Sequence, residues 1–129
     1  MPRVLVVDDD RVIQQLLVVN LELEGYDVET ASDGEEALER IMKTGYDVVL
    51  LDVMMPKMDG REVCRRVKGN AKRKDTPIIF LSARAQDLDV RQGYELGVSA
   101  YVTKPFDPVD LLDVVERVIK GEQVLPPSP

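Results

Sequence analysis

Residues 47–52 read Asp47-Val48-Val49-Leu50-Leu51-Asp52, an apolar run that ends in a carboxylate. Apolar residues at successive positions indicate a strand that is buried on both faces, as in parallel sheets. Open α/β sheets place their functional groups at the carboxyl ends of such strands. We therefore expect Asp52 to lie in a functional site at the edge of a parallel sheet.

A second strand with the same character opens the chain. Residues 3–7 read Arg3-Val4-Leu5-Val6-Val7, and Asp8, Asp9 and Asp10 follow directly. Two such strands side by side would gather several carboxylates in one cleft, where they cannot all stay ionised unless a cation neutralises them. The expected cation is Mg²⁺, with Mn²⁺ as its substitute, because the ligands are hard oxygens and the chain has no histidine.

The rest of the chain alternates between strand and helix patterns. Further strands are predicted near 26–30, 77–81 and 100–102, and helices near 12–24, 33–44, 60–68, 86–96 and 108–119. Alternating strands and helices imply a mostly parallel sheet covered on both faces. The sequence thus predicts the doubly wound α/β class, with a five-stranded parallel sheet and helices on both faces.

Capping residues and apolar spacing predict the helix ends and buried faces. Ser32 followed by Glu35 fits a capping box, so Ser32 is the expected cap of the second helix. Asp10, Asp59 and Asp107 are the expected caps of the first, third and last helices. In the first helix the predicted buried face consists of Val12, Ile13, Leu16, Leu17, Asn20 and Leu23.

Composition restricts the classes of function. The chain has 129 residues, 44% of them hydrophobic, which suits one compact domain. A net charge of -7 without a basic stripe gives no electrostatic reason to bind nucleic acid or an anionic membrane directly. The first apolar run is too short for a signal sequence or a membrane span, so we expect a cytoplasmic protein. The lack of histidine excludes a Ser-His-Asp triad and any phosphohistidine within this chain.

Four motifs, in this order, resemble the receiver domains of two-component response regulators. They are Asp8-Asp9, Asp52 within Asp-x-x-Met-Pro-x-Met-Asp-Gly, Ser82-Ala83, and Lys104-Pro105-Phe106. The resemblance covers about residues 3–120, nearly the whole chain. It implies a receiver domain over residues 1–120 with the flavodoxin-like strand order 2-1-3-4-5. Residues 121–129 would then be a Pro-rich tail or the start of an interdomain linker.

The resemblance also implies a role for each polar residue at the sheet edge. Asp52 would be the phosphoacceptor. The metal ligands would be the carboxylates of Asp9 and Asp52, the backbone carbonyl of Met54, and Asp8 through a water molecule. The phosphoryl group would be bound by Ser82, Lys104 and the backbone of Ala83.

A conformational switch is the second implication of the resemblance. Movement of the Ser82 hydroxyl toward the phosphoryl group would let Tyr101 change rotamer. That change would alter the surface formed by the helix near 86–96, the strand near 100–102 and the last helix. Met54 and Arg84 would lie where they tune dephosphorylation, and their bulk leads us to expect slow loss of the phosphoryl group, measurable as the lifetime of the phosphorylated protein.

The partners follow from the same resemblance. The phosphoryl donor would be a phosphohistidine on a sensor histidine kinase or on a histidine phosphotransfer protein. The receiver would act on a downstream effector or an output domain, with a phosphorylation-dependent homodimer as another outcome and no direct contact with nucleic acid or membrane. Apart from its own phosphorylation and autodephosphorylation, it would catalyse no reaction.

The sequence leaves three alternative functions to weigh, and it differs from one branch of the receiver family at two positions. A degenerate receiver that acts as a constitutive docking module would need a lost motif, and none is lost. An aspartate-nucleophile phosphohydrolase of the haloacid dehalogenase type would need a second acid where Met54 stands. A dinucleotide-binding module would need a Gly-x-Gly-x-x-Gly after the first strand. Ser99 and Ala100 replace the acidic pair usual in the winged-helix branch, which weakens the inference of that branch's dimer.

Overall fold

The computed structural model describes residues 1–82, 92 and 95–124. Five parallel strands form one sheet in the order β2-β1-β3-β4-β5. Their bounds are β1 Arg3–Val7, β2 Asp27–Ala31, β3 Val48–Asp52, β4 Ile78–Ser82 and β5 Ala100–Thr103. The predicted fold class and strand order are confirmed.

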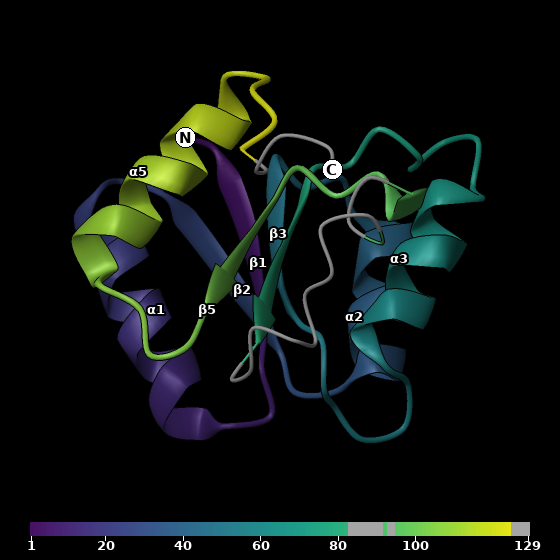
Figure 1. Ribbon diagram of the computed structural model, residues 1–129, viewed down its shortest axis with the longest axis horizontal. Coiled ribbons are helices and arrows are strands. Elements are labelled where there is room, and N and C mark those ends of the chain that lie inside the picture. The colour runs from purple at the N-terminus through teal and green to yellow at the C-terminus, as the bar shows by residue number, and fades with distance from the viewer. Residues whose placement is uncertain (83–91, 93–94, 125–129) are drawn as a thin grey trace.

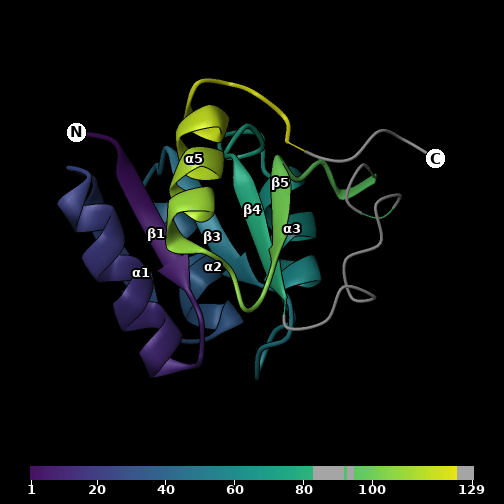
Figure 2. The same cartoon turned by 60° about the vertical axis from the view of Figure 1, so that its left-hand side comes forward.

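Among the described residues, two helices cover each face of this sheet. Helices α1 (Arg11–Leu23) and α5 (Pro108–Ile119) pack on one face, and α2 (Gly34–Lys43) and α3 (Gly60–Lys68) pack on the other. Figure 1 and Figure 2 show the sheet between these two layers. The helix predicted near 86–96 lies mostly outside the described residues. None of the helices that the structure describes is long and apolar enough to cross a membrane.

The central strands have apolar side chains on both faces because each face carries its own core. In β3, Leu50 packs into the core beneath α1 and α5, while Leu51 packs into the core beneath α2 and α3. The same alternation in β1 and β4 explains their unbroken apolar runs. The register pairs Val7 with Leu51, so β1 and β3 end at the same level.

The predicted cap of α2 is wrong by one residue. Asp33, not Ser32, is the N-cap, and its Oδ1 accepts a hydrogen bond from the Glu36 amide at 2.8 Å. Glu36, not Glu35, completes the arrangement, because its Oε1 accepts from the Ser32 amide at 2.9 Å. The other three expected caps, Asp10, Asp59 and Asp107, are confirmed, because their side chains accept hydrogen bonds from amides of the first turn.

The predicted buried face of α1 is confirmed for Leu17 and, as a partly buried residue, for Ile13, but it is wrong for Val12, Leu16 and Leu23. The buried residues of this helix are Gln14, Leu17 and Leu21. Exposed apolar side chains instead form a stripe at intervals of four, three and four residues, which places them on one side of the helix. We call this the α1 stripe, and it consists of Val12, Leu16, Val19 and Leu23, exposed by 76%, 41%, 53% and 80%.

Residues beyond α5 return to the sheet. Val124 forms an isolated parallel bridge with Ala100, and its amide donates to the Ser99 carbonyl at 2.6 Å. Gln123 donates from its side chain to the Val98 carbonyl at 3.2 Å. The segment therefore runs along β5 at least as far as Val124. The domain boundary near residue 120 stays a prediction, and residues 125–129 lie outside the described ranges.

Candidate functional site

Three carboxylates converge at the carboxyl edge of the central strands. Asp8 and Asp9 follow β1, and Asp52 is the last residue of β3. One oxygen of each carboxylate lies within 4.8 Å of the other two. Asp8 is fully buried and Asp52 is 5% exposed, whereas Asp9 is open to solvent. The structure therefore brings together the acids that the sequence placed at two strand ends.

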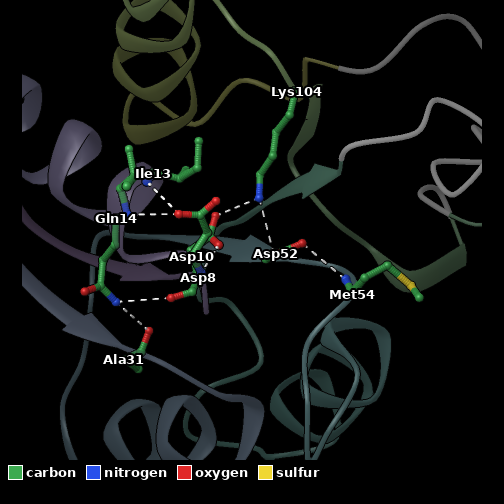
Figure 3. A network of polar contacts seen from close by, with 9 residues as sticks. Asp8, Asp10, Ile13, Gln14, Ala31, Asp52, Met54 and Lys104 are labelled. Atoms are coloured by element: carbon green, nitrogen blue, oxygen red, sulfur yellow. Dashed lines mark hydrogen bonds and ion pairs between the residues drawn. The ribbon is translucent and has the colours of Figure 1, made fainter.

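Lys104 supplies a positive charge opposite the two buried acids. Its Nζ lies 2.8 Å from Oδ2 of Asp8 and 3.3 Å from Oδ2 of Asp52, as Figure 3 shows. The β4–β5 ladder positions this lysine, because Thr103 pairs with Ser82 and the Lys104 amide donates to the Ser82 carbonyl at 2.6 Å. From the end of β5, its side chain thus reaches the ends of both central strands.

Burial and charge shift the proton equilibria of this group. Burial raises the pKa of Asp52 to about 6; Lys104 opposes the rise, and the charge of Asp8 adds to it. Burial alone would lower the pKa of Lys104, but hydrogen bonding to Asp8 and the charge of Asp52 outweigh burial and raise it above its ordinary value. Lys104 therefore remains an ammonium group and neutralises only part of the negative charge around it.

The donor set suits a small, hard dication. Asp8, Asp9 and Asp52 offer oxygen atoms close together, and their combined charge exceeds that of Lys104. Mg²⁺ prefers oxygen ligands and is commonly bound in proteins through one or two carboxylates together with water. These residues therefore fit the magnesium ion that the sequence predicted.

Main-chain amides fix the direction of the two buried carboxylates. The Asp10 amide donates to Oδ1 of Asp8 at 2.9 Å, and the Met54 amide donates to Oδ1 of Asp52 at 3.2 Å. The side chain of Asp10 turns toward the first turn of α1, which it caps. In each buried carboxylate, Oδ1 accepts from a main-chain amide and Oδ2 faces Lys104.

The two predicted switch residues lie on the neighbouring strands β4 and β5. Ser82 is fully buried and ends β4, one strand away from Asp52. Tyr101 lies in β5, where it pairs with Phe80 of β4 and is partly buried against the core beneath α2 and α3. Both residues interact with other groups of the folded chain, and their role in a switch stays a prediction.

The residues expected to tune dephosphorylation are described only in part. The Met54 side chain is 49% exposed and extends away from the carboxyl group of Asp52 in Figure 3. Its sulfur lies 3.9 Å from Nη2 of Arg61, whose guanidinium also pairs with Asp59 at 3.2 Å. Arg84, together with Ala83, whose backbone was expected to bind the phosphoryl group, lies outside the described residues.

Sequence reasoning missed one polar residue that contacts the site. Gln14 is 7% exposed, and its Nε2 donates to the main-chain carbonyls of Asp8 at 3.2 Å and Ala31 at 3.1 Å. Its spacing could have revealed it, because it stands three residues before Leu17 and seven before Leu21, on the same helix face. A search for apolar residues at helical spacing does not detect a polar residue on the buried face.

Comparison with a family model and with curated proteins points to one family. The family model of the response regulator receiver domain matches residues 4–116. The alkaline phosphatase synthesis transcriptional regulatory protein PhoP of Bacillus subtilis is 43% identical over 126 residues, which cover 98% of this chain and 52% of that protein. The chain spans about half the length of the curated relatives it matches.

Solved structures agree with the sequence relatives. The receiver domain of the Francisella response regulator 1452 is 37% identical with a TM-score of 0.85, covering 93% of this chain and 98% of that one. The receiver domain of the sensor histidine kinase PA1611 from Pseudomonas aeruginosa is 29% identical with a TM-score of 0.85 and the same coverage. That structure has a magnesium ion coordinated in its active-site cleft.

Proposed function

Because this chain belongs to the response regulator receiver domain family, we propose that it is a phosphorylation-dependent signalling switch whose phosphoacceptor is Asp52. The observation that carries this proposal is the position of Asp52 at the end of β3. There it shares Lys104 with Asp8 and lies within 4.8 Å of both other acids. A carboxylate held in this way can act as a nucleophile toward a phosphoryl group.

The metal ligands in this proposal are the carboxylates of Asp9 and Asp52 and the main-chain carbonyl of Met54, with Asp8 acting through water. Bound Mg²⁺ would supply charge neutralisation for the phosphoryl oxygens. The proximity of the three carboxylates supports this assignment. Lys104 supports it too, because one ammonium leaves negative charge for a dication to balance.

The proposed reaction transfers one phosphoryl group. A carboxylate oxygen of Asp52 forms a bond to phosphorus while the bond from phosphorus to the donor imidazole nitrogen breaks, and the electron pair of that bond stays on the nitrogen. Lys104 would then pair with a phosphoryl oxygen, and the Ser82 hydroxyl and the Ala83 backbone would donate to others. These three groups would hold the product rather than take part in bond making.

The proposed switch starts at Ser82, which ends β4. Its movement toward the phosphoryl group would alter the space beside Tyr101 on β5 and thereby the surface around β5 and α5. The proximity of the two strands supports this route, because residues 79–82 of β4 pair with all four residues of β5. A coupling of about 1–3 kcal/mol would change partner affinity roughly 5- to 150-fold.

The phosphoryl donor in this proposal is a protein that carries a phosphohistidine, either a sensor histidine kinase or a histidine phosphotransfer protein. The α1 stripe supports a protein donor, since its four apolar side chains are exposed on the helix that begins directly after the acids. Exposed apolar side chains grouped in this way mark interaction surfaces. We propose that the donor packs on the α1 stripe while its imidazole reaches Asp52.

A variant in the α1 stripe should separate a protein donor from a small one. Val19→Glu is expected to slow transfer from a phosphohistidine protein about tenfold and to leave the rate with acetyl phosphate unchanged. Ala71→Glu, which adds the same charge in the exposed loop after α3, serves as the control. Equal slowing with both donors, or no slowing with the protein donor, would contradict docking on the stripe.

Other proposed partners lie downstream. Because the curated relatives are about twice as long as this chain and are named transcriptional regulatory proteins, we propose that the receiver controls an output domain or a separate effector. Direct nucleic-acid binding is not proposed for the receiver, whose charge of -7 disfavours it. A phosphorylation-dependent homodimer, a cytoplasmic location and the lack of any other catalysed reaction stay predictions.

The proposed function is tested by incubating the protein with acetyl phosphate and Mg²⁺ and measuring its intact mass. We expect a gain of one phosphoryl group that disappears in EDTA and in the Asp52→Asn variant. Asp75→Asn removes an exposed acid in the loop after α3 and should keep the gain. If the mass does not increase even when short-lived adducts are trapped, the chain is a constitutive docking module instead.

A further inference from the structure

Gln14 is a buried polar residue for which the proposed reaction has no role. It lies on the face of α1 that packs on the sheet, between the ends of β1 and β2, and is 7% exposed. Its side-chain nitrogen has two hydrogens and donates to two carbonyl oxygens, that of Asp8 at 3.2 Å and that of Ala31 at 3.1 Å. Figure 3 shows both contacts.

These contacts extend the β1–β2 ladder past its last paired residues. Val7 pairs with Ala31, and the Asp8 amide still donates to the Ala31 carbonyl at 3.2 Å. The Asp8 carbonyl belongs to the peptide group that joins Asp8 to Asp9, just where the ladder ends. Gln14 binds this carbonyl and the Ala31 carbonyl with one amide group, so it fixes the peptide relative to β2.

The orientation of the Asp8–Asp9 peptide sets the direction of the Asp9 carboxylate. A peptide group is planar, so the direction of its carbonyl sets where the next Cα and Cβ lie. Turning the Asp8–Asp9 peptide would swing the exposed Asp9 carboxylate away from Asp52. Asp8 is held in addition by Lys104 and by the Asp10 amide, whereas no hydrogen bond or ion pair to another described residue holds the Asp9 carboxylate.

We propose that Gln14 is a positioning residue that holds the Asp8–Asp9 peptide so that the Asp9 carboxylate faces Asp52. This inference rests on the proposed magnesium-dependent function. Gln14 touches none of the proposed metal-ligand atoms and acts through the main chain of the acids. Removing a residue that orients metal ligands without binding the metal commonly lowers metal affinity 10- to 100-fold.

The decisive variant is Gln14→Met, which keeps a similar length and loses both donors. We expect the Mg²⁺ dissociation constant, measured by calorimetry, to rise about tenfold. The Mg²⁺ concentration for half-maximal phosphorylation by acetyl phosphate should rise by the same factor, while the rate at saturating Mg²⁺ stays within about twofold. Gln15→Met makes the same chemical change at the exposed neighbouring position and should alter neither value.

A purely structural role predicts a different pattern. Gln14→Met would then unfold at lower urea concentration but bind Mg²⁺ with wild-type affinity when folded, and that result would overturn the proposal. If the wild type itself shows no Mg²⁺ affinity, the proposed function and this inference fail together. If the wild type binds Mg²⁺ and folded Gln14→Met binds equally well, only the inference about Gln14 fails.

The unmodified protein provides a second measurement if Gln14→Met does not fold. In nuclear magnetic resonance spectra, addition of Mg²⁺ should shift the side-chain amide resonance of Gln14 and leave that of Gln15 in place. The Gln14 amide protons should also exchange slowly with solvent, since both are hydrogen-bonded in a buried position. Saturation with Mg²⁺ without any shift at Gln14 would show that the amide is not linked to the metal ligands.

Discussion

In EDTA, the Asp52→Asn variant is expected to unfold at a higher urea concentration than the wild type, although it accepts no phosphoryl group. Asp52 is almost fully buried and shares Lys104 with the buried Asp8. Removing one of these negative charges relieves both desolvation and repulsion. A pKa raised from 3.8 to about 6 corresponds to about 1–3 kcal/mol of lost stability at neutral pH, which the variant should recover.

The stability difference should depend on pH with a definite sign. The pKa of Asp52 is higher in the folded protein than its ordinary value, so the folded protein binds the proton more tightly than the unfolded chain does. This proton stabilises the fold at low pH, and the contribution is lost as the pH rises from about 4 through about 6. In EDTA, the advantage of Asp52→Asn should therefore be largest above about pH 7 and should shrink toward about pH 5.

Asp9→Asn is the matched control for this prediction. Asp9 belongs to the same cluster but is open to solvent, so the removal of its charge should change the urea midpoint in EDTA much less. Two results would contradict the electrostatic account: an Asp52→Asn variant no more stable than the wild type at neutral pH, or an advantage that grows as the pH falls.

Gly60→Ala should destabilise the fold by about 3 kcal/mol. Gly60 begins α3, and its amide donates to the Val53 carbonyl at 2.9 Å. A Cβ at this position would run into the main-chain oxygen of Asp52 and would lie 3.0 Å from the Cα of Val53. Because both obstacles are main chain at the end of β3, they can yield only by moving the strand end. Urea unfolding should show the loss of stability, and phosphorylation by acetyl phosphate should slow because Asp52 is displaced.

Gly45→Ala is the control, because it adds the same methyl group in open surroundings. The nearest atom to a Cβ there is the guanidinium Nη1 of Arg73 at 3.4 Å, the end of a flexible side chain. We expect the free energy of unfolding to change by less than about 1 kcal/mol. Similar losses in Gly60→Ala and Gly45→Ala would show that contact with the end of β3 is not the cause.

The sheet could be predicted from the sequence because its central strands are buried on both faces. Runs such as Val48–Leu51 favour a strand over a helix because they are short, contain β-branched valines and end in polar residues. The edge strand β2 has polar residues among apolar ones, and its predicted range, 26–30, begins one residue before the observed one. Continuous burial gives a clear pattern, whereas half-buried strands give a weaker one.

The helix errors have a physical cause in overlapping patterns. Ser32 with Glu35 and Asp33 with Glu36 both fit a capping box, and local sequence does not choose between them. In the folded protein Gly34, the residue after the cap Asp33, lies against the main chain of Met58. Local sequence does not show this long-range contact. In α1, apolar residues outnumber the positions that face the sheet, so spacing alone did not separate the exposed α1 stripe from the buried face.

The acids of the candidate site could be predicted because parallel strands end at a common edge. Asp8 and Asp52 follow directly from that rule and from the apolar runs before them. The role of Lys104 was predicted only from the family resemblance, because nothing in its local sequence shows that its side chain reaches Asp8 at the end of β1. Gln14 was missed because its role depends on main-chain carbonyls, which any residue could provide, and on helix packing that no motif records.

We expect Asp52, which lies with Asp8 and Asp9 at the sheet edge, to carry the transferable phosphoryl group. The most direct measurement is reduction with borohydride after incubation with acetyl phosphate and Mg²⁺, followed by peptide mapping. Hydride reduces an aspartyl phosphate to homoserine and so marks the modified residue. We expect homoserine at position 52 only, and only when Mg²⁺ is present. Homoserine at another acid, or the same yield in EDTA, would contradict this expectation.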